Sequence, residues 1–263
     1  MLTACPVILL RVIGRIAATV LAALALAACG EKEEPTVLDN PDLIVFAAAS
    51  MTVPLERCAA DFPEAGIKLS FAGSDTLAAQ IRQGVKPDIF AAANASIPAE
   101  LFADGLLGRP TEFATNELVV AVPKGSPVNA VEGLARSDVS IAIGSETAPV
   151  GIYARAVIGR LPAKQEDAIL ANVRSEEPDV SGIIGKLTQG AVDAGFVYVS
   201  DVASSAEELR SVALPRELRP DVTYAAGVTA ETPEPGAAAA FIGDLLRGGC
   251  QQALLDAGFG PAP

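Results

Sequence analysis

The sequence contains no histidine and no tryptophan, and aromatic residues make up only 5% of it. The absence of histidine removes the residue that most often serves as a general base or a zinc ligand, and it excludes a Ser-His-Asp triad. Positive charge is also scarce, because 19 Lys and Arg stand against 32 Asp and Glu, which gives a formal charge of −13. Without a basic stripe for phosphate contacts, the sequence argues against a nucleic-acid partner.

The sequence also lacks a hydrophobic run long enough to remain in a membrane as a helix. Residues 16–28 are apolar, but a membrane-spanning helix needs about 20 such residues. Arg11 and Arg15 precede the run and small residues end it, which is the pattern of a secretory signal. A permanent N-terminal membrane helix is the alternative, and the shortness of the run argues against it.

The end of this run, Leu26-Ala27-Ala28-Cys29, resembles the cleavage box of bacterial lipoproteins. The resemblance implies that residues 1–28 are a lipoprotein signal peptide, cut before Cys29, whose thiol then carries lipid. Cleavage would remove two arginines and change the formal charge from −13 to −15. Residues 29–41 are charged and contain proline, so we expect a flexible tether. The protein would then be extracytoplasmic, either periplasmic or on the cell surface, and held at the membrane by its lipid alone.

Cysteine is rare as well, with four residues in the whole chain. Cys5 lies in the predicted signal peptide and Cys29 is the predicted lipid site, so Cys58 and Cys250 remain. An even pair in an oxidising compartment predicts one disulfide. Such a bond would tie the N-terminal part of the folded body to its C-terminal part. Two buried free thiols are the alternative.

What the chain does contain is a regular alternation of short apolar runs with helical patterns. Residues 43–49 indicate a buried strand, residues 67–71 and 87–92 indicate two further strands, and helical spacing follows each of them. This alternation predicts an α/β fold with largely parallel strands. The hydrophobic content of 51% is ample for a packed core.

The length of the body and its proline-rich connections predict two lobes between which the chain crosses twice. We expect lobe I to consist of residues 42–117 and 222–263, and lobe II to consist of residues 118–221. Each lobe would hold a mixed, mostly parallel sheet flanked by helices.

Three segments share one pattern, in which a strand ends, small or hydroxyl residues follow, and a helix begins. They are residues 47–52 with Ser50, residues 71–76 with Ser74, and residues 144–151. A helix N-terminus carries unpaired N–H groups and about half a positive charge, so it binds anions without a basic side chain. Several such ends around one point would bind a doubly charged oxyanion, because net charge mainly affects the rate of encounter.

Each candidate residue also has an ordinary structural explanation. Ser50 and Ser74 stand where serine usually caps a helix. Tyr198 lies on a predicted buried strand, where a tyrosine is commonly a packed ring with one satisfied hydroxyl. Asp75 would repel a bound dianion unless its carboxylate turns away.

Five blocks of the sequence, in order and spacing, resemble the periplasmic molybdate-binding proteins of ABC importers. The similarity extends over roughly residues 43–260. The blocks are FAAASMT (46–52), FAGSDTLAAQI (71–81), PDIFAAAN (87–94), PVGIYA (149–154) and DAGFVYVSD (193–201).

The resemblance implies a two-lobed periplasmic-binding-protein fold that closes on the anion and performs no catalysis. It also implies that the ligand oxygens accept hydrogen bonds from the hydroxyls of Ser50 and Ser74, the backbone amides of Val150 and Val180, and the hydroxyl of Tyr198. The metal of molybdate would then have no direct protein ligand. Asp75 departs from the family pattern, which commonly has serine there.

The sequence therefore predicts a monomeric solute-binding lipoprotein that captures molybdate or tungstate between hinged lobes and delivers it to an ABC transporter permease, without a cofactor. Alternatives are a binding protein for phosphate or sulfate, with Asp75 accepting a phosphate proton, and an envelope lipoprotein with no transport role. A serine hydrolase is a further alternative. It would need a lysine base, and the nearest in sequence, Lys68, lies on a predicted strand beside no nucleophile elbow.

Overall fold

The computed structural model describes residues 40–263. The predicted signal peptide, the predicted lipid site Cys29 and nearly all of the predicted tether therefore lie outside the described residues. Within the described part, none of the helices combines the length and the apolar character that a bilayer-crossing segment requires.

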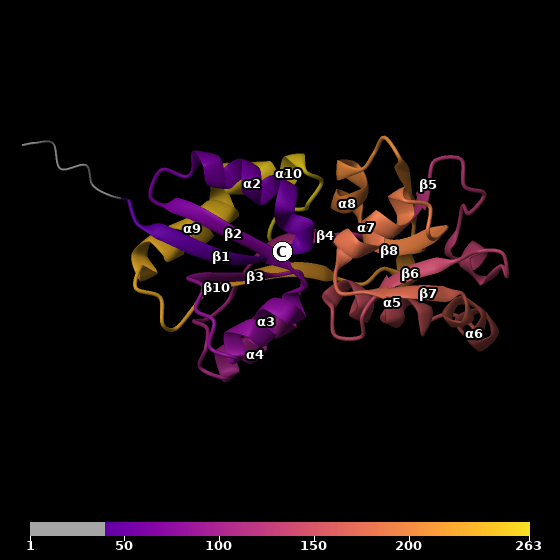
Figure 1. The fold of residues 1–263 in the computed structure, drawn as a ribbon, viewed down its shortest axis with the longest axis horizontal. Helices are drawn as coiled ribbons and strands as arrows, with labels where there is room; N and C mark the ends of the chain where they lie inside the picture. Colours follow the sequence, from indigo (N-terminus) through magenta and orange to yellow (C-terminus); the bar gives the residue numbers. More distant parts are fainter. Residues whose placement is uncertain (1–39) are drawn as a thin grey trace, which may run out of the picture. The chain divides into compact units, whose positions relative to one another are not determined.

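The first of two sheets contains the N-terminal strands and one strand from near the C-terminus (Figure 1). Its order is β2-β1-β3-β10-β4. The strands are β1 (Asp42–Ala48), β2 (Gly66–Ala72), β3 (Ile89–Ala92), β4 (Thr111–Asn116) and β10 (Val222–Val228). β1 pairs in parallel with β2 and β3, whereas β10 runs antiparallel to β3 and β4.

Helices cover both faces of the first sheet. One group packs together beside β2, β10 and β4, and the other packs on β1, β3 and β10, on the opposite side in Figure 1. The first group is α2 (Thr52–Asp61), α9 (Pro235–Arg247) and α10 (Gly249–Asp256), and the second is α3 (Ser74–Arg82) and α4 (Ser96–Ala103). A 3₁₀ turn, η1 (Ala49–Met51), joins β1 to α2.

The second sheet is built from the middle of the chain and has the order β7-β6-β8-β5-β9. β6 pairs in parallel with β7 and β8, and β5 runs antiparallel to β8 and β9. The strands are β5 (Leu118–Pro123), β6 (Ile141–Gly144), β7 (Val173–Glu177), β8 (Ala194–Tyr198) and β9 (Leu209–Ala213). The helices are α5 (Pro149–Ile158), α6 (Ala163–Ala171), α7 (Val180–Thr188) and α8 (Val199–Ser204), with 3₁₀ turns η2 (Val131–Ala135) and η3 (Arg216–Leu218).

The prediction of mixed sheets flanked by helices is confirmed. The chain passes from the first sheet to the second between β4 and β5, and returns between β9 and β10. Parallel pairing accounts for half of the strand pairs in each sheet, because β5 and β10, the first strand after each passage, run antiparallel to their neighbours.

The predicted disulfide is also confirmed. Cys58 on α2 is bonded to Cys250 on α10, across 192 residues of sequence, and both residues are buried. The bond therefore holds the C-terminal helix against the first helix of the described body.

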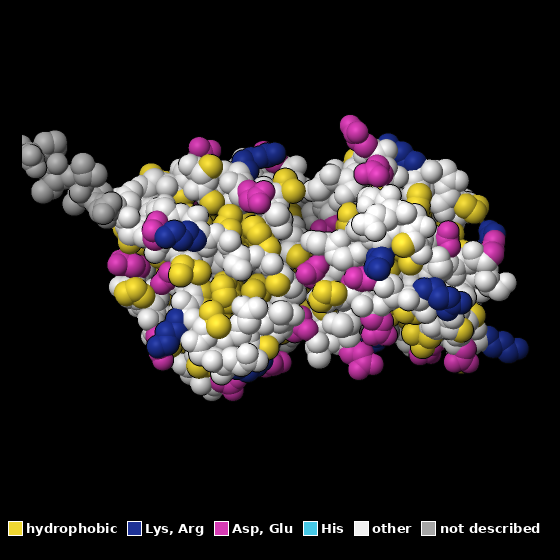
Figure 2. All heavy atoms as spheres, viewed as in Figure 1, with side chains coloured by type: hydrophobic (Ala, Val, Ile, Leu, Met, Phe, Trp, Pro, Cys, Tyr) yellow, Lys and Arg dark blue, Asp and Glu magenta, His cyan; other side chains and the backbone are white. Residues whose placement is uncertain are grey.

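Charged side chains are dispersed over the surface. On the face drawn in Figure 2, Lys and Arg stand singly among Asp and Glu, and no continuous basic band is visible there. Several cations pair with carboxylates, as Arg136 does with Asp138 and Arg219 with Glu117. Exposed pairs of this kind contribute little to stability, typically about 0–1 kcal/mol.

Candidate functional site

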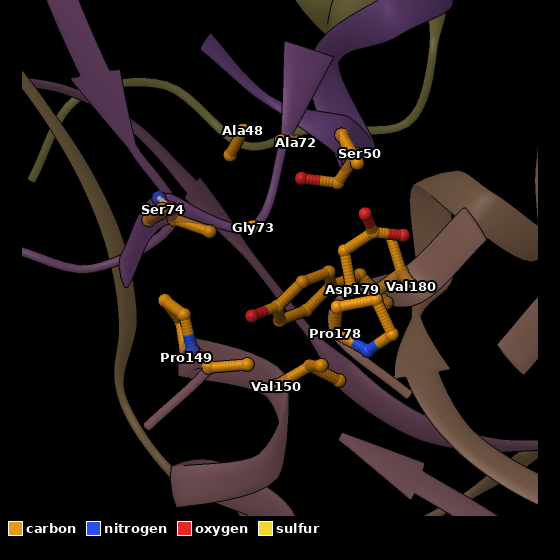
Figure 3. A pocket seen from close by; sticks show the side chains of 14 residues that line it. Ala48, Ser50, Ala72, Gly73, Ser74, Pro149, Val150, Pro178, Asp179 and Val180 are labelled. Carbon is orange, nitrogen blue, oxygen red and sulfur yellow. Dashed lines mark hydrogen bonds between the residues drawn. The ribbon is translucent and has the colours of Figure 1, made fainter. Parts of the chain in front are cut away.

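A small cavity lies where strands of both sheets end and helices begin (Figure 3). Its volume is about 20 Å³, whereas a single water molecule needs about 10–15 Å³. The cavity therefore fits a compact ion of a few atoms and is too small for a sugar or an amino acid. The lining residues come from six segments of the chain: Ala48, Ala49, Ser50, Ala72, Gly73, Ser74, Ala93, Ala148, Pro149, Val150, Pro178, Asp179, Val180 and Tyr198.

The start of several helices is the common feature of this lining. Ser50 lies in η1, Ser74 is the first residue of α3, Val150 the second of α5 and Val180 the first of α7. No Lys or Arg is among the described residues that line the cavity. The positive potential at this point therefore comes from backbone N–H groups and helix dipoles, which suit an anion.

The structure brings Ser50 and Ser74 together at the cavity, and neither serves as a helix cap. Ser74 Oγ accepts a hydrogen bond from the backbone N–H of Ala93 at 3.0 Å. The Ser74 hydroxyl proton is thus free to point elsewhere, and the cavity is the space beside it. Ser50 Oγ lies 2.8 Å from the hydroxyl oxygen of Tyr224. In Figure 3, Ser50 and Ser74 lie on the side of the cavity opposite to Pro149 and Val150.

The hydroxyl oxygen of Tyr198 is the polar atom of the cavity that most clearly indicates a bound ligand. Tyr198 is the last residue of β8, is only 1% exposed, and lines the cavity. Its hydroxyl oxygen has no hydrogen-bond partner among residues 40–263. Leaving such a group unpaired costs about 1–3 kcal/mol, so a native partner outside the protein is expected. Burial raises the pKa of Tyr198 well above its ordinary value, so the phenol stays protonated and acts as a donor.

Val150 and Val180 offer backbone donors from the other side. Both stand in the first turn of their helices, where N–H groups have no intrahelical partner. Asp179, just before α7, is the one charged side chain among the described lining residues. Its Oδ1 accepts hydrogen bonds from the N–H groups of Ser181 and Gly182, so the carboxylate caps the helix. All five residues predicted for ligand binding thus line a single cavity.

Asp75 does not line the cavity. Its carboxylate accepts a hydrogen bond from the hydroxyl of Thr147, which lies in the turn before α5 of the second sheet. Its Oδ2 therefore reaches across to the opposite side, whereas its Oδ1 is buried next to Gly73 without a hydrogen-bond partner among residues 40–263. Nearby, an added Cβ on Gly73 would lie 2.5 Å from the carbonyl oxygen of Pro178, so the two sides are in close contact here.

Sequence reasoning missed four residues that shape the site. Ala93 and Tyr224 are the partners of the two serines, Thr147 is the partner of Asp75, and Asp179 caps α7. Only Asp179 had a local signal, because an aspartate directly before an apolar helical stretch is a typical N-cap.

Comparison with known proteins identifies the family. A family model described as "Bacterial extracellular solute-binding protein" matches residues 43–260. The chain belongs to this family. A relative from Mycobacterium tuberculosis, "Molybdate-binding protein ModA", is 31% identical over 248 residues, which cover 89% of this chain and 92% of that protein. A Bacillus subtilis protein, "Putative ABC transporter substrate-binding lipoprotein YvgL", is 29% identical and covers 82% and 85%.

Among solved structures, the periplasmic molybdate-binding protein of Azotobacter vinelandii superposes with a TM-score of 0.73. It is 22% identical, and the match covers 82% of this chain and 98% of that one. At this identity the likeness speaks for the fold, and it confirms the predicted periplasmic-binding-protein architecture.

The serine hydrolase alternative finds no support in the geometry of this solute-binding protein. Lys68 pairs with Asp42 on the first sheet, and the groups hydrogen-bonded to the two serines are the phenol of Tyr224 and the backbone N–H of Ala93. Neither partner is a base that could take a proton from serine. The described residues also contain no cluster of three or more acidic or cysteine side chains arranged to hold a metal ion.

Asp201 is a buried carboxylate whose pKa is raised by this environment. It is buried in the first turn of α8, and its Oδ2 accepts the backbone N–H of Tyr198 at 2.8 Å. Burial, with a smaller effect of Asp179, raises the pKa of Asp201 from 3.8 to about 7. The folded state therefore holds this proton at pH values where the unfolded chain has lost it, and stability falls as pH rises from about 4 to about 7.

Replacing Asp201 with asparagine is expected to raise the melting temperature by a few degrees at pH 8 and by less at pH 5.5. The amide oxygen still accepts the Tyr198 N–H but carries no buried charge at high pH. Thermal unfolding at the two pH values measures this. Asp167→Asn, on the exposed side of α6, should produce no such pH-dependent difference. An equal shift of the Asp201 variant at both pH values would contradict the assigned pKa.

Proposed function

We propose that the protein is an extracytoplasmic solute-binding lipoprotein that captures molybdate, or tungstate, and delivers it to an ABC importer. The observation that carries the proposal is the composition of the cavity. Hydroxyl groups and helix N-termini line it, no cation does, and the Tyr198 hydroxyl is buried there without a partner in the described chain. Such a site offers donors on every side and suits a compact dianion that accepts hydrogen bonds from all of them.

In this proposal the ligand oxygens accept hydrogen bonds from five groups. These are the hydroxyls of Ser50, Ser74 and Tyr198 and the backbone N–H groups of Val150 and Val180. The donors come from both sheets, which supports a trap that closes when one anion engages both sets. Residues 42–117 and 222–263 would move as lobe I against residues 118–221 as lobe II.

The relatives support the choice of ligand and location. Proteins named as molybdate-binding, and one named as a substrate-binding lipoprotein, share most of their length with this chain. Lipidation at Cys29 and delivery to a permease belong to the same proposal, with the protein acting as a monomer that needs no cofactor and performs no catalysis. The placement of Asp75 outside the cavity lining gives no support to the phosphate alternative.

Isothermal titration of the protein with molybdate, tungstate, sulfate and phosphate tests the proposal. We expect tight binding of molybdate and tungstate and weaker binding of sulfate, because donors set for longer metal–oxygen bonds hold a smaller anion loosely. Phosphate should bind weakly, since its remaining proton needs an acceptor. A ligand that binds only the folded state must raise the melting temperature. Absence of both heat and thermal shift with molybdate and tungstate would reject the proposed function.

A further inference from the structure

Behind the cavity, the part-buried Asn116 and the fully buried Tyr224 form a chain of hydrogen bonds that ends at Ser50. Tyr224 on β10 is fully buried and does not line the cavity. Its hydroxyl oxygen lies 2.8 Å from Ser50 Oγ and 3.5 Å from Nδ2 of Asn116. Asn116 is the last residue of β4. These contacts join residues that are 174 and 108 positions apart in sequence.

The direction of these hydrogen bonds follows from the orientation of the Asn116 side-chain amide. Asn116 Oδ1 accepts the backbone N–H of Glu117 at 2.9 Å, which fixes the orientation of the side-chain amide. The Nδ2 group must then face Ser200 Oγ, at 2.9 Å, and the Tyr224 hydroxyl. Because Nδ2 carries only hydrogen atoms to donate, Asn116 is a donor to Tyr224 and cannot accept its proton.

The Tyr224 proton has one acceptor left among the described residues, which is Ser50 Oγ. If Ser50 donated to Tyr224 instead, the phenol proton would be buried without a partner, at a cost of about 1–3 kcal/mol. Ser50 therefore accepts from Tyr224, and its own proton is directed to the cavity. Ser74 is arranged in the same way, because its Oγ accepts the N–H of Ala93 and its own proton remains free for the cavity.

We propose that Tyr224 and Asn116 are positioning residues that hold the Ser50 hydroxyl as a hydrogen-bond donor and thereby select oxyanions that carry no proton. This inference rests on the proposed function. With its acceptor side occupied, Ser50 offers the ligand a proton and no lone pair. An anion such as molybdate or sulfate gains from this arrangement, whereas the P–OH group of hydrogen phosphate meets a second donor.

The test compares three anions with the wild-type protein and Tyr224→Phe, by isothermal titration at neutral pH, with phosphate measured by competition against molybdate. Loss of the phenol hydroxyl frees Ser50 Oγ to turn and to accept. We expect the affinities for molybdate and sulfate to fall about tenfold and the affinity for phosphate to stay unchanged or to rise. The molybdate-to-phosphate ratio then falls about tenfold, while the molybdate-to-sulfate ratio does not change. A merely structural role for Tyr224 would weaken all three anions alike.

Tyr198→Phe is the matched control, because it removes a phenol hydroxyl that faces the ligand directly. It should weaken all three anions and leave both ratios near their wild-type values. Equal losses for the three anions in Tyr224→Phe, or an unchanged molybdate affinity, would overturn the inference. Failure of the wild-type protein to bind molybdate, tungstate or sulfate would instead overturn the proposed function, so the two failures are distinguishable.

A second variant decides the matter if Tyr224→Phe does not fold or if phosphate is too weak to compete in either protein. Asn116→Asp places an acceptor where the donor was, so the Tyr224 proton turns to it and Ser50 donates to Tyr224 instead of to the ligand. We expect molybdate affinity to fall at least tenfold relative to Asn129→Asp, which adds the same charge at an exposed position. Equal affinity in these two variants would overturn the inference.

Discussion

Replacing Val180 with proline is expected to weaken molybdate binding by about ten- to a hundredfold while the protein remains folded. Proline deletes one backbone N–H, and a hydrogen bond to a charged partner contributes about 1.5–3 kcal/mol, with each 1.4 kcal/mol equal to a factor of ten. Val180 is the first residue of α7. Proline is well tolerated at that position, because its fixed φ suits the helix and the lost N–H has no intrahelical partner.

Asp179, the residue before Val180, is also compatible with a proline at position 180. Asp179 has φ −159° and ψ 178°, an extended conformation compatible with a following proline. Its carboxylate still accepts the N–H groups of Ser181 and Gly182. Titration with molybdate and tungstate measures the loss. The matched control is Ala163→Pro, at the first residue of α6 and far from the cavity lining, which should bind as the wild type does. Wild-type affinity in Val180→Pro would remove Val180 from the donor set.

The central strands of both sheets could be predicted from sequence, whereas of the edge strands only β2 could, from the run at residues 67–71. The predicted runs at residues 43–49 and 194–199 correspond to β1 and β8, which are buried along most of their length. The unpredicted β7 and β9 stand at the edges of the second sheet, and β4 stands at an edge of the first. Edge strands are partly exposed and tolerate charge, as in Val173–Glu177, which ends in two glutamates. An apolar run is therefore a reliable signal for strands that are covered on both faces, and β2 is the edge strand that kept a recognisable pattern, with Ile67, Leu69 and Phe71 alternating with polar residues.

In the candidate site, too, the features set by neighbouring residues could be predicted, and those that depend on residues far apart in sequence could not. Ser50 and Ser74 follow strands directly, so the sequence pattern alone indicates that they stand at helix starts. Their convergence with Val180 and Tyr198 depends on how two sheets face each other, and only the resemblance to a family supplied that. Neither the local sequence pattern nor the family resemblance predicted the hydrogen-bond partners of these groups, because Tyr224 lies 174 residues from Ser50 and no local pattern joins them.

Replacing Gly73 with alanine is expected to weaken molybdate binding by about ten- to a hundredfold, by preventing closure. Gly73 has φ −58° and ψ 138°, which any residue adopts, so alanine does not strain the local backbone. Its Cβ, however, would lie 2.5 Å from the carbonyl oxygen of Pro178 and 2.8 Å from Asp75 Oδ1. Such overpacking costs about 1–3 kcal/mol. The Asp75 carboxylate is the end of a side chain on the same side and can turn away, so the remaining cost is the contact with the Pro178 backbone, where the two sides meet.

The same substitution tests whether the ligand-free protein is open. If the lobes separate without ligand, Gly73→Ala should unfold at the wild-type temperature and lose only the increase in melting temperature that molybdate produces. Gly236→Ala, at a position in α9 with open space around it, should leave the increase in melting temperature that molybdate produces unchanged. If Gly73→Ala lowers the melting temperature without ligand by the amount expected for a buried clash, the lobes are closed before binding. In that case the anion enters a preformed site, and closure cannot be the event that an importer detects.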